Sequence, residues 1–192
     1  MDELKNKGSS SLTLRWPYLI ILGDTQELVD AKTGAGLVQW CPEKVAGQLR
    51  FDNCLVDLGV SDLSISEAID RGVKSVVIGV APTGGQINQR WICLLEEAAA
   101  AGLDIVSGLH CRLEDFSSLV AAAESSGARL VNVRTSADNL PIGTGLKRSG
   151  RRLLTVGTDC AIGKKYSALS ITQCMKDRGI NVDFRATGQT GI

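Results

Sequence analysis

The segment GTDCAIGKK, residues 157–165, has the residue types and the spacing of a loop that binds phosphate. It follows an apolar run and precedes a segment of helical period, a context in which backbone N–H groups and the helix dipole point at an anion. Gly157 and Gly163 would allow close backbone approach, and Lys164 would place an ammonium on a phosphate oxygen. The sequence therefore predicts an anion cradle; the alternative is a glycine-rich turn with an exposed lysine.

The spacing of this loop argues against a magnesium-dependent hydrolase. The loop has one more residue between its glycines than the commonest phosphate-binding pattern, and Lys165 stands where magnesium would require a hydroxyl. Ser167 could supply that hydroxyl from the next helical turn, or Tyr166 and Ser167 could contact the organic part of a ligand. Cys160 could be a reactive thiolate at the helix N-terminus, or a packing residue. The candidate cofactor-binding residues are Gly157, Thr158, Asp159, Cys160, Ala161, Ile162, Gly163, Lys164, Lys165, Tyr166 and Ser167.

A second glycine-rich loop, ATGQTG at residues 186–191, follows the apolar run INVDF. In a parallel sheet this loop would open on the same edge as the first, so two polar loops could share one ligand. Thr187, Gln189 and Thr190 supply uncharged donors that suit a phosphate, an amide or an acyl carbonyl. They are candidate substrate-binding residues, and the alternative is an ordinary polar loop.

The single histidine of the chain, His110, is the candidate general base. It comes just after the apolar run LDIVSG, where the carboxyl end of a strand would present it to a cleft. The alternative is a histidine that only hydrogen-bonds within its loop. Lys32 begins KTGAG, which we interpret as a glycine-rich turn that could bind an anionic substrate, although a solvated lysine would look the same. APTGG, residues 81–85, could likewise bring backbone N–H groups to a carboxylate, or be a plain turn.

Short β-branched runs alternate with segments of helical period, which predicts an α/β fold with a mostly parallel sheet. The expected helices span residues 64–72, 88–102, 116–127 and 166–178, with Asn88 as an N-cap. The expected strands are YLIIL (18–22), NCLVDLG (53–59), SVVIGV (75–80), LDIVSG (103–108), RLVNVR (129–134), RLLTVG (152–157) and INVDF (180–184).

A loss of periodicity with Pro, Gly, Ser and Asn marks a domain boundary after residue 134. We expect a first domain over residues 1–140, a linker over 141–150, and the start of a second domain over 151–192. Roughly 40 residues are too few for a complete nucleotide-binding α/β domain. We therefore expect a truncated second domain in a chain that is a fragment and could itself be inactive.

The composition favours a cytoplasmic protein with a small-molecule substrate. Lys and Arg number 21 and so do Asp and Glu, so nothing in the overall charge favours nucleic acid or an anionic membrane. The apolar runs are too short to span a bilayer, and the polar lead-in MDELKNKGSSS, which we expect to be disordered, lacks the features of a secretory signal. The six cysteines contain no C-x-x-C pair, so we expect free thiols and no metal site.

At GTDCAIGKKYSAL and FRATGQTGI the chain resembles DUF1611, a family of two-domain P-loop proteins. The resemblance continues at KTGAGLVQW (32–40), GVAPTGGQI (79–87), SGLHCRL (107–113) and VNVR (131–134), in the order of the family. It implies a Rossmann-like N-terminal parallel-sheet domain followed by a P-loop NTPase-like α/β domain. Many relatives carry threonines shortly after the P-loop lysine, whereas here only Ser167 keeps a hydroxyl.

The resemblance implies an enzyme that uses acetyl-CoA as co-substrate to acetylate the amino group of a D-amino acid, with D-glutamate the leading substrate. In that function Lys164 and the loop amides would hold the CoA phosphates, and a homo-oligomer would be possible. The GTDxxxGK element is also similar to dethiobiotin synthetase, which suggests the alternative of an ATP- and magnesium-dependent ligase or kinase with Ser167 or Asp159 as ligands. A further alternative is a non-catalytic module that binds a nucleotide or CoA.

Overall fold

The structure is a computed structural model that describes residues 13–81, 87–134, 145–146, 149–159 and 162–185. The chain divides into two compact units, Met1–Arg134 and Thr135–Ile192. Each unit is described below by itself. None of the described helices is both long enough and apolar enough to cross a membrane.

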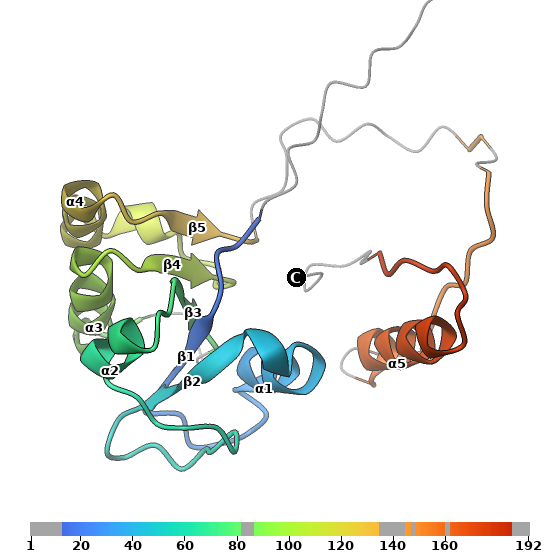
Figure 1. Cartoon of the computed structure of the whole chain (residues 1–192), viewed down its shortest axis with the longest axis horizontal. Helices are drawn as coiled ribbons and strands as arrows, with labels where there is room; N and C mark the ends of the chain where they lie inside the picture. Colours follow the sequence, from blue (N-terminus) through green and yellow to red (C-terminus); the bar gives the residue numbers. More distant parts are fainter. Residues whose placement is uncertain (1–12, 82–86, 135–144, 147–148, 160–161, 186–192) are drawn as a thin grey trace, which may run out of the picture. The chain divides into compact units, whose positions relative to one another are not determined.

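The first unit is built on a five-stranded sheet with the order β2-β1-β3-β4-β5 (Figure 1). All four neighbouring pairs of strands are parallel, as the alternation of strand and helix patterns predicts. Every residue of β1, β3 and β4 is buried, which explains why the middle of each strand is apolar. The strands are β1 (Tyr18–Gly23), β2 (Val45–Arg50), β3 (Ser75–Ile78), β4 (Asp104–Ser107) and β5 (Leu130–Asn132).

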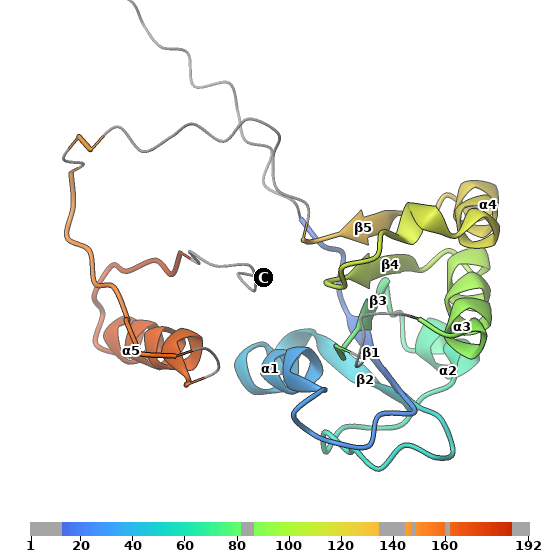
Figure 2. The same ribbon diagram turned by 180° about the vertical axis from the view of Figure 1, so that it is seen from behind.

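Helices cover both faces of this sheet, as Figures 1 and 2 show from opposite sides. Helices α2 (Ile65–Asp70), α3 (Gln89–Ala100) and α4 (Ser117–Ser126) lie on one face, and α1 (Lys32–Trp40) lies on the other. Their limits follow local chemistry. The Ser64 side chain accepts from the backbone of Glu67 in a capping box, and the Asn88 side chain accepts from the N–H of Trp91. The predicted α/β architecture is confirmed, and so are the three helices expected at residues 64–72, 88–102 and 116–127, which are α2, α3 and α4.

Two elements of the first unit differ from the sequence prediction. The expected strand at residues 53–59 is wrong: this segment is a loop, and the strand is VAGQLR, residues 45–50, which ends before the expected strand begins. The loop satisfies its backbone with side chains instead of a neighbouring strand, because Leu58 N donates to Gln48 Oε1 (2.9 Å) and Gly59 N to Asp57 Oδ1 (2.7 Å). The expected glycine-rich turn at KTGAG is the first half of α1.

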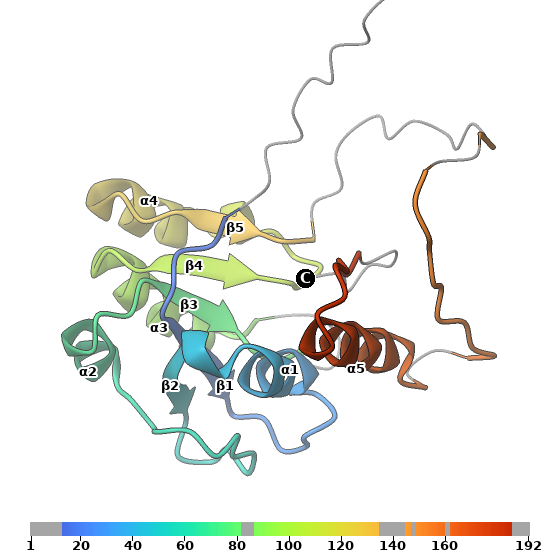
Figure 3. The same cartoon turned by 45° about the vertical axis from the view of Figure 1, so that its right-hand side comes forward.

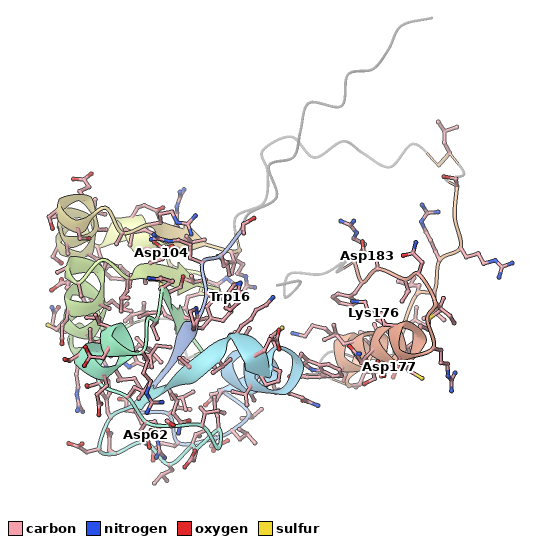
Figure 4. All side chains as sticks on the ribbon, viewed as in Figure 1. Trp16, Asp62, Asp104, Lys176, Asp177 and Asp183 are labelled. Atoms are coloured by element: carbon pink, nitrogen blue, oxygen red, sulfur yellow. The ribbon has the colours of Figure 1, made fainter. Side chains whose placement is uncertain are left out.

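An N-terminal strap, residues 13–17, crosses the amino ends of the strands. The Arg15 carbonyl accepts from Ser75 Oγ (2.5 Å), and the Pro17 carbonyl accepts from Lys74 N (2.9 Å). Arg15 also donates two hydrogen bonds to the carboxylate of Asp104, which Figure 4 labels at the start of β4. The strap thereby connects the amino ends of β3 and β4, which are far apart in the sequence. The lead-in predicted to be disordered lies outside the described residues.

The second unit contains α5 (Lys164–Asp177), which confirms the helix expected after the phosphate-binding motif. The expected strands at residues 152–157 and 180–184 are not strands here. A strand is stabilised by hydrogen bonds to a neighbouring strand, and the described part of this unit contains no strand with which either segment pairs. Apolar side chains therefore remain exposed along the first segment, 70% for Leu153 and 78% for Val156.

Candidate functional site

The motif GTDCAIGKK places a glycine at the start of α5. Gly163 is the N-cap of the helix, and its φ of 94° lies in the left-handed region that glycine adopts without strain. The Ser167 N–H donates to the Gly163 carbonyl at 2.9 Å and closes the first helical turn. No side chain caps this helix, and its first turn contains no acidic residue. No carboxylate in the first turn of α5 therefore offsets the positive end of the helix dipole.

Lys164 folds back over the loop that precedes it. Its Nζ donates to the carbonyl of Asp159, and its own carbonyl accepts from Thr155 Oγ1 at 3.0 Å. A Cβ on Gly157 would lie 2.2 Å from Ile162 Cδ1 and 3.2 Å from Lys164 Cδ. Glycine at position 157 thus makes room for the two side chains that pack over the loop. The structure brings Gly157 and Lys164 together, as the motif requires.

The remaining residues of the motif are mostly exposed. Thr158, Asp159, Lys165 and Ser167 are exposed, and Lys165 Nζ lies 5.7 Å from the centre of the half-buried Tyr166 ring. Their side chains can therefore reach a ligand without rearrangement of a core. Cys160 and Ala161 in this loop, and Thr187, Gln189 and Thr190 in the second predicted loop, lie outside the described residues.

The first unit collects its other candidate residues at the carboxyl edge of the sheet. His110 follows β4 and is exposed, and Lys32 is the exposed first residue of α1, which follows β1. Strand β3 lies between β1 and β4, and the chain leaves β1 and β3 toward opposite faces of the sheet. Ligands of open α/β sheets bind at such a switch point. Parallel strands therefore bring His110 and Lys32 to the same edge.

Hydrogen bonds join the loops at this switch point. Gly34 N donates to the Gly79 carbonyl and Ala81 N donates to the Asp30 carbonyl, both at 2.8 Å. A Cβ on Gly79 would lie 3.2 Å from Gly34 Cα, so α1 packs directly on the backbone at the end of β3. The segment APTGG begins here, and its residues after Ala81 lie outside the described part of the chain.

Asp24 is a carboxylate at this edge to which the sequence pattern assigns no role. It directly follows β1, and its Oδ1 accepts a 3.1 Å hydrogen bond from Trp91 Nε1. Trp91 is 5% exposed and stacks edge-on against Phe51. An acidic residue immediately after a buried strand is the signal that would have found Asp24.

The thiol next to His110 is unsuited to nucleophilic catalysis. Burial raises the pKa of Cys111, and the nearby Asp115 carboxylate raises it further. The thiol is therefore protonated at neutral pH, and a protonated thiol is a poor nucleophile. In the described ranges no group of three His, Cys, Asp or Glu side chains could hold a metal ion.

Comparisons with known proteins assign both halves of the chain. Residues 50–136 match the DUF1611_N Rossmann-like domain, and residues 141–192 match the DUF1611_C P-loop domain; both are described as domains of unknown function. A crystal structure of a DUF1611 family protein from Anabaena variabilis superposes with a TM-score of 0.74 at 32% identity, covering 92% of this chain and 54% of that one.

Two curated relatives carry the name D-glutamate N-acetyltransferase. The protein from Tritonibacter scottomollicae is 45% identical over 176 residues, which are 92% of this chain and 53% of the relative. The protein from a Pseudoalteromonas species is 40% identical over 181 residues, which are 94% of this chain and 54% of the relative. The chain thus spans about half the length of each, from the Rossmann-like domain into the P-loop.

Proposed function

We propose, because the chain belongs to the DUF1611 family with its Rossmann-like and P-loop domains, that the full-length protein transfers an acetyl group from acetyl-CoA to the amino group of D-glutamate. The observation that carries this proposal is the 45% identity, over 92% of the chain, to a protein named D-glutamate N-acetyltransferase. The geometry agrees with it, because one unit offers an anion cradle and the other offers an exposed imidazole.

In this function the loop at residues 157–163 and the start of α5 hold the phosphates of CoA. Uncapped N–H groups at a helix N-terminus bind phosphate through hydrogen bonds and the helix dipole. Lys164 already lies over this loop, and its ammonium would exchange the Asp159 carbonyl for a phosphate oxygen. Holding a phosphate requires donors and charge, whereas hydrolysing one requires a positioned metal ion as well. Lys165 in place of a hydroxyl residue therefore favours an anchoring role.

His110 is the proposed general base of the transfer. The amino group of D-glutamate is mostly an ammonium at neutral pH and must lose a proton before it attacks the thioester carbonyl. As the amine attacks, the C–N bond forms, the C–S bond breaks, and CoA leaves as the thiol once it is protonated. His110 takes the proton from the amine. Lys32, Thr187, Gln189 and Thr190 are the proposed contacts to the acceptor.

The test is an assay of the full-length protein with acetyl-CoA and D-glutamate, in which thiol release is followed and the product is identified by mass spectrometry. We expect N-acetyl-D-glutamate from D-glutamate, and little product from L-glutamate. The variant His110→Gln should lower kcat by about 10²- to 10⁴-fold, as expected for loss of a general base, with a nearly unchanged KM for acetyl-CoA.

Two results would replace this proposal. Magnesium-dependent consumption of ATP without consumption of acetyl-CoA would identify a ligase or kinase, a function to which a glycine-rich loop with a lysine at a helix N-terminus is also suited. Tight binding of acetyl-CoA or a nucleotide without any product would identify a non-catalytic module.

A further inference from the structure

His110 lies in a short segment that two neighbouring strands hold at both ends. The residue is exposed, whereas Leu109 before it and Leu113 after it are only 7% and 0% exposed. The segment is therefore buried at both ends and exposed in the middle, and each buried end is held by a hydrogen-bonded support. This arrangement would fix the position of the imidazole more firmly than an ordinary surface loop would.

The first support comes from the end of β4. Ser107, the last residue of β4, is 1% exposed, and its Oγ accepts a hydrogen bond from Leu109 N at 3.1 Å. The carbonyl of Ser107 accepts from Val133 N at 2.9 Å, which continues the pairing with β5 beyond the strand. The hydroxyl thus holds the backbone one residue before His110.

The second support comes from the end of β5, directly beside the first. Asn132 is the register partner of Ser107, and its Oδ1 accepts from Leu113 N at 3.0 Å. Its amide nitrogen donates to both carboxylate oxygens of Glu114, at 2.7 and 2.9 Å. Asn132 thus fixes the start of the 3-10 helix η3 (Leu113–Asp115), three residues after His110.

We infer that Ser107 and Asn132 are positioning residues that hold His110 in place for proton transfer, an inference that rests on the proposed function. A general base acts only within hydrogen-bond reach of the proton it removes. A displacement of about 1 Å can lower a rate by about 10²-fold. Neither side chain needs to touch the substrate, because each acts through the backbone on one side of the imidazole.

The decisive experiment is a double-mutant cycle in the full-length protein, with Ser107→Ala made in the wild type and in the His110→Gln variant. We expect Ser107→Ala to lower kcat by about 10-fold or more in the wild type, with the KM for acetyl-CoA unchanged within twofold. In the His110→Gln background the same substitution should leave kcat unchanged, because no base remains to be positioned.

Ser126→Ala is the matched control. Ser126 Oγ accepts from Ala128 N at 3.2 Å and donates to the Ala99 carbonyl at 2.6 Å, so this variant, like Ser107→Ala, loses a hydrogen bond from the backbone N–H two residues later. It should lower Tm about as much as Ser107→Ala while kcat stays at the wild-type value. Asn132→Ala loosens the other end of the segment and gives the same test if Ser107→Ala does not fold.

The inference is wrong if Ser107→Ala and Asn132→Ala lower Tm but leave kcat unchanged, or if they lower kcat equally in both backgrounds. Either result would mean that these side chains only stabilise the fold. A failure of the underlying function looks different: the wild type would form no N-acetyl product, or His110→Gln would retain the wild-type kcat. Those results would remove the base and, with it, the positioning role.

Discussion

The carboxylate of Asp104 shows how one residue joins distant parts of the chain. Its side chain is 0% exposed and accepts hydrogen bonds from Arg15 of the N-terminal strap and from Arg129, including one of 2.6 Å from Arg129 Nη2. Burial by itself raises the pKa of this carboxyl group. The hydrogen bonds from the two arginines outweigh burial and hold the pKa at about 2, below the ordinary value of 3.8.

This pKa predicts how stability depends on pH. Because the pKa is lower in the folded state, the Asp104 contribution is fully present above pH 3.8 and is lost as pH falls toward 2. The shift corresponds to on the order of 2 kcal/mol. Asp104→Asn should lower the free energy of unfolding at pH 7 by roughly 2 to 4 kcal/mol, because it leaves two arginines facing a neutral amide. Urea unfolding at pH 7 measures this difference.

The control for Asp104→Asn is Asp62→Asn, which removes a carboxylate that pairs with Arg50 at 2.5 Å but is 52% exposed. An exposed pair contributes about 1 kcal/mol or less, so this variant should be nearly as stable as the wild type. Equal losses for the two variants would show that burial of Asp104 does not decide its contribution. A difference between Asp104→Asn and wild type that does not shrink below pH 3.8 would contradict the assigned pKa.

At the scale of elements, the predictions from the sequence are right for the fully buried strands. They are wrong for elements whose conformation depends on neighbouring segments. The runs YLIIL and SVVIGV are apolar throughout because helices cover both faces of β1 and β3, and both strands were predictable. The edge strand β2 carries Gly, Gln and Arg, so it lacks this signal. The loop 53–59 resembles a strand in its apolar residues, but side chains of Gln48 and Asp57 satisfy its backbone.

Helix α1 was missed for a similar reason. Its two glycines favour a turn by intrinsic preference, yet Gly34 lies in the helix because the backbone of β3 approaches there. The helix that begins after Gly163 and the close approach of Gly157 and Lys164 were predictable from spacing alone, because glycine and lysine act there through local geometry. The roles of Ser107 and Asn132 beside His110 were not predictable, because these two residues lie side by side only through the register of β4 and β5.

Gly34→Ala tests how closely α1 packs against the sheet at this position. The new Cβ would lie 2.9 Å from Ile20 Cγ2 and 3.0 Å from Leu58 Cδ1, so neighbouring atoms must move. Alanine would stabilise an isolated helix by about 1 kcal/mol relative to glycine, but overpacking of this kind costs typically 1 to 3 kcal/mol. We expect a net loss of roughly 1 kcal/mol in urea unfolding. An increase in stability would show that α1 has room for a side chain at this position.

At the scale of the whole molecule, the first unit has its own core. The residues of both apolar clusters lie between Leu14 and Val133, and all five strands of the sheet belong to Met1–Arg134. We propose that the first domain extends to residue 140 and that residues 141–150 link it to the P-loop domain, which begins at residue 151.

Residues 1–134 should therefore fold without the rest of the chain. We expect a single cooperative thermal transition by circular dichroism and a dispersed amide NMR spectrum, as for an independent domain with one core. The variant Leu95→Ala, which truncates a side chain that is 0% exposed, should lower the stability of this piece by roughly 2 to 5 kcal/mol. A non-cooperative transition would mean that the sheet depends on the second unit.

The central claim is that the loop before α5 binds the phosphates of CoA, and calorimetric titration of the full-length protein tests it most directly. Acetyl-CoA, and separately ATP with magnesium, would be titrated into the wild type, Lys164→Ala and Lys176→Ala. Lys176, which Figure 4 labels, is the matched control, because it lies in the last turn of the same helix. A rise of 1.5 Å per residue places it roughly 18 Å from Lys164 along the helix axis. We predict that acetyl-CoA binds to the wild type and to Lys176→Ala, and that Lys164→Ala abolishes binding. Binding of ATP with magnesium alone, or acetyl-CoA binding that survives Lys164→Ala, would contradict the claim.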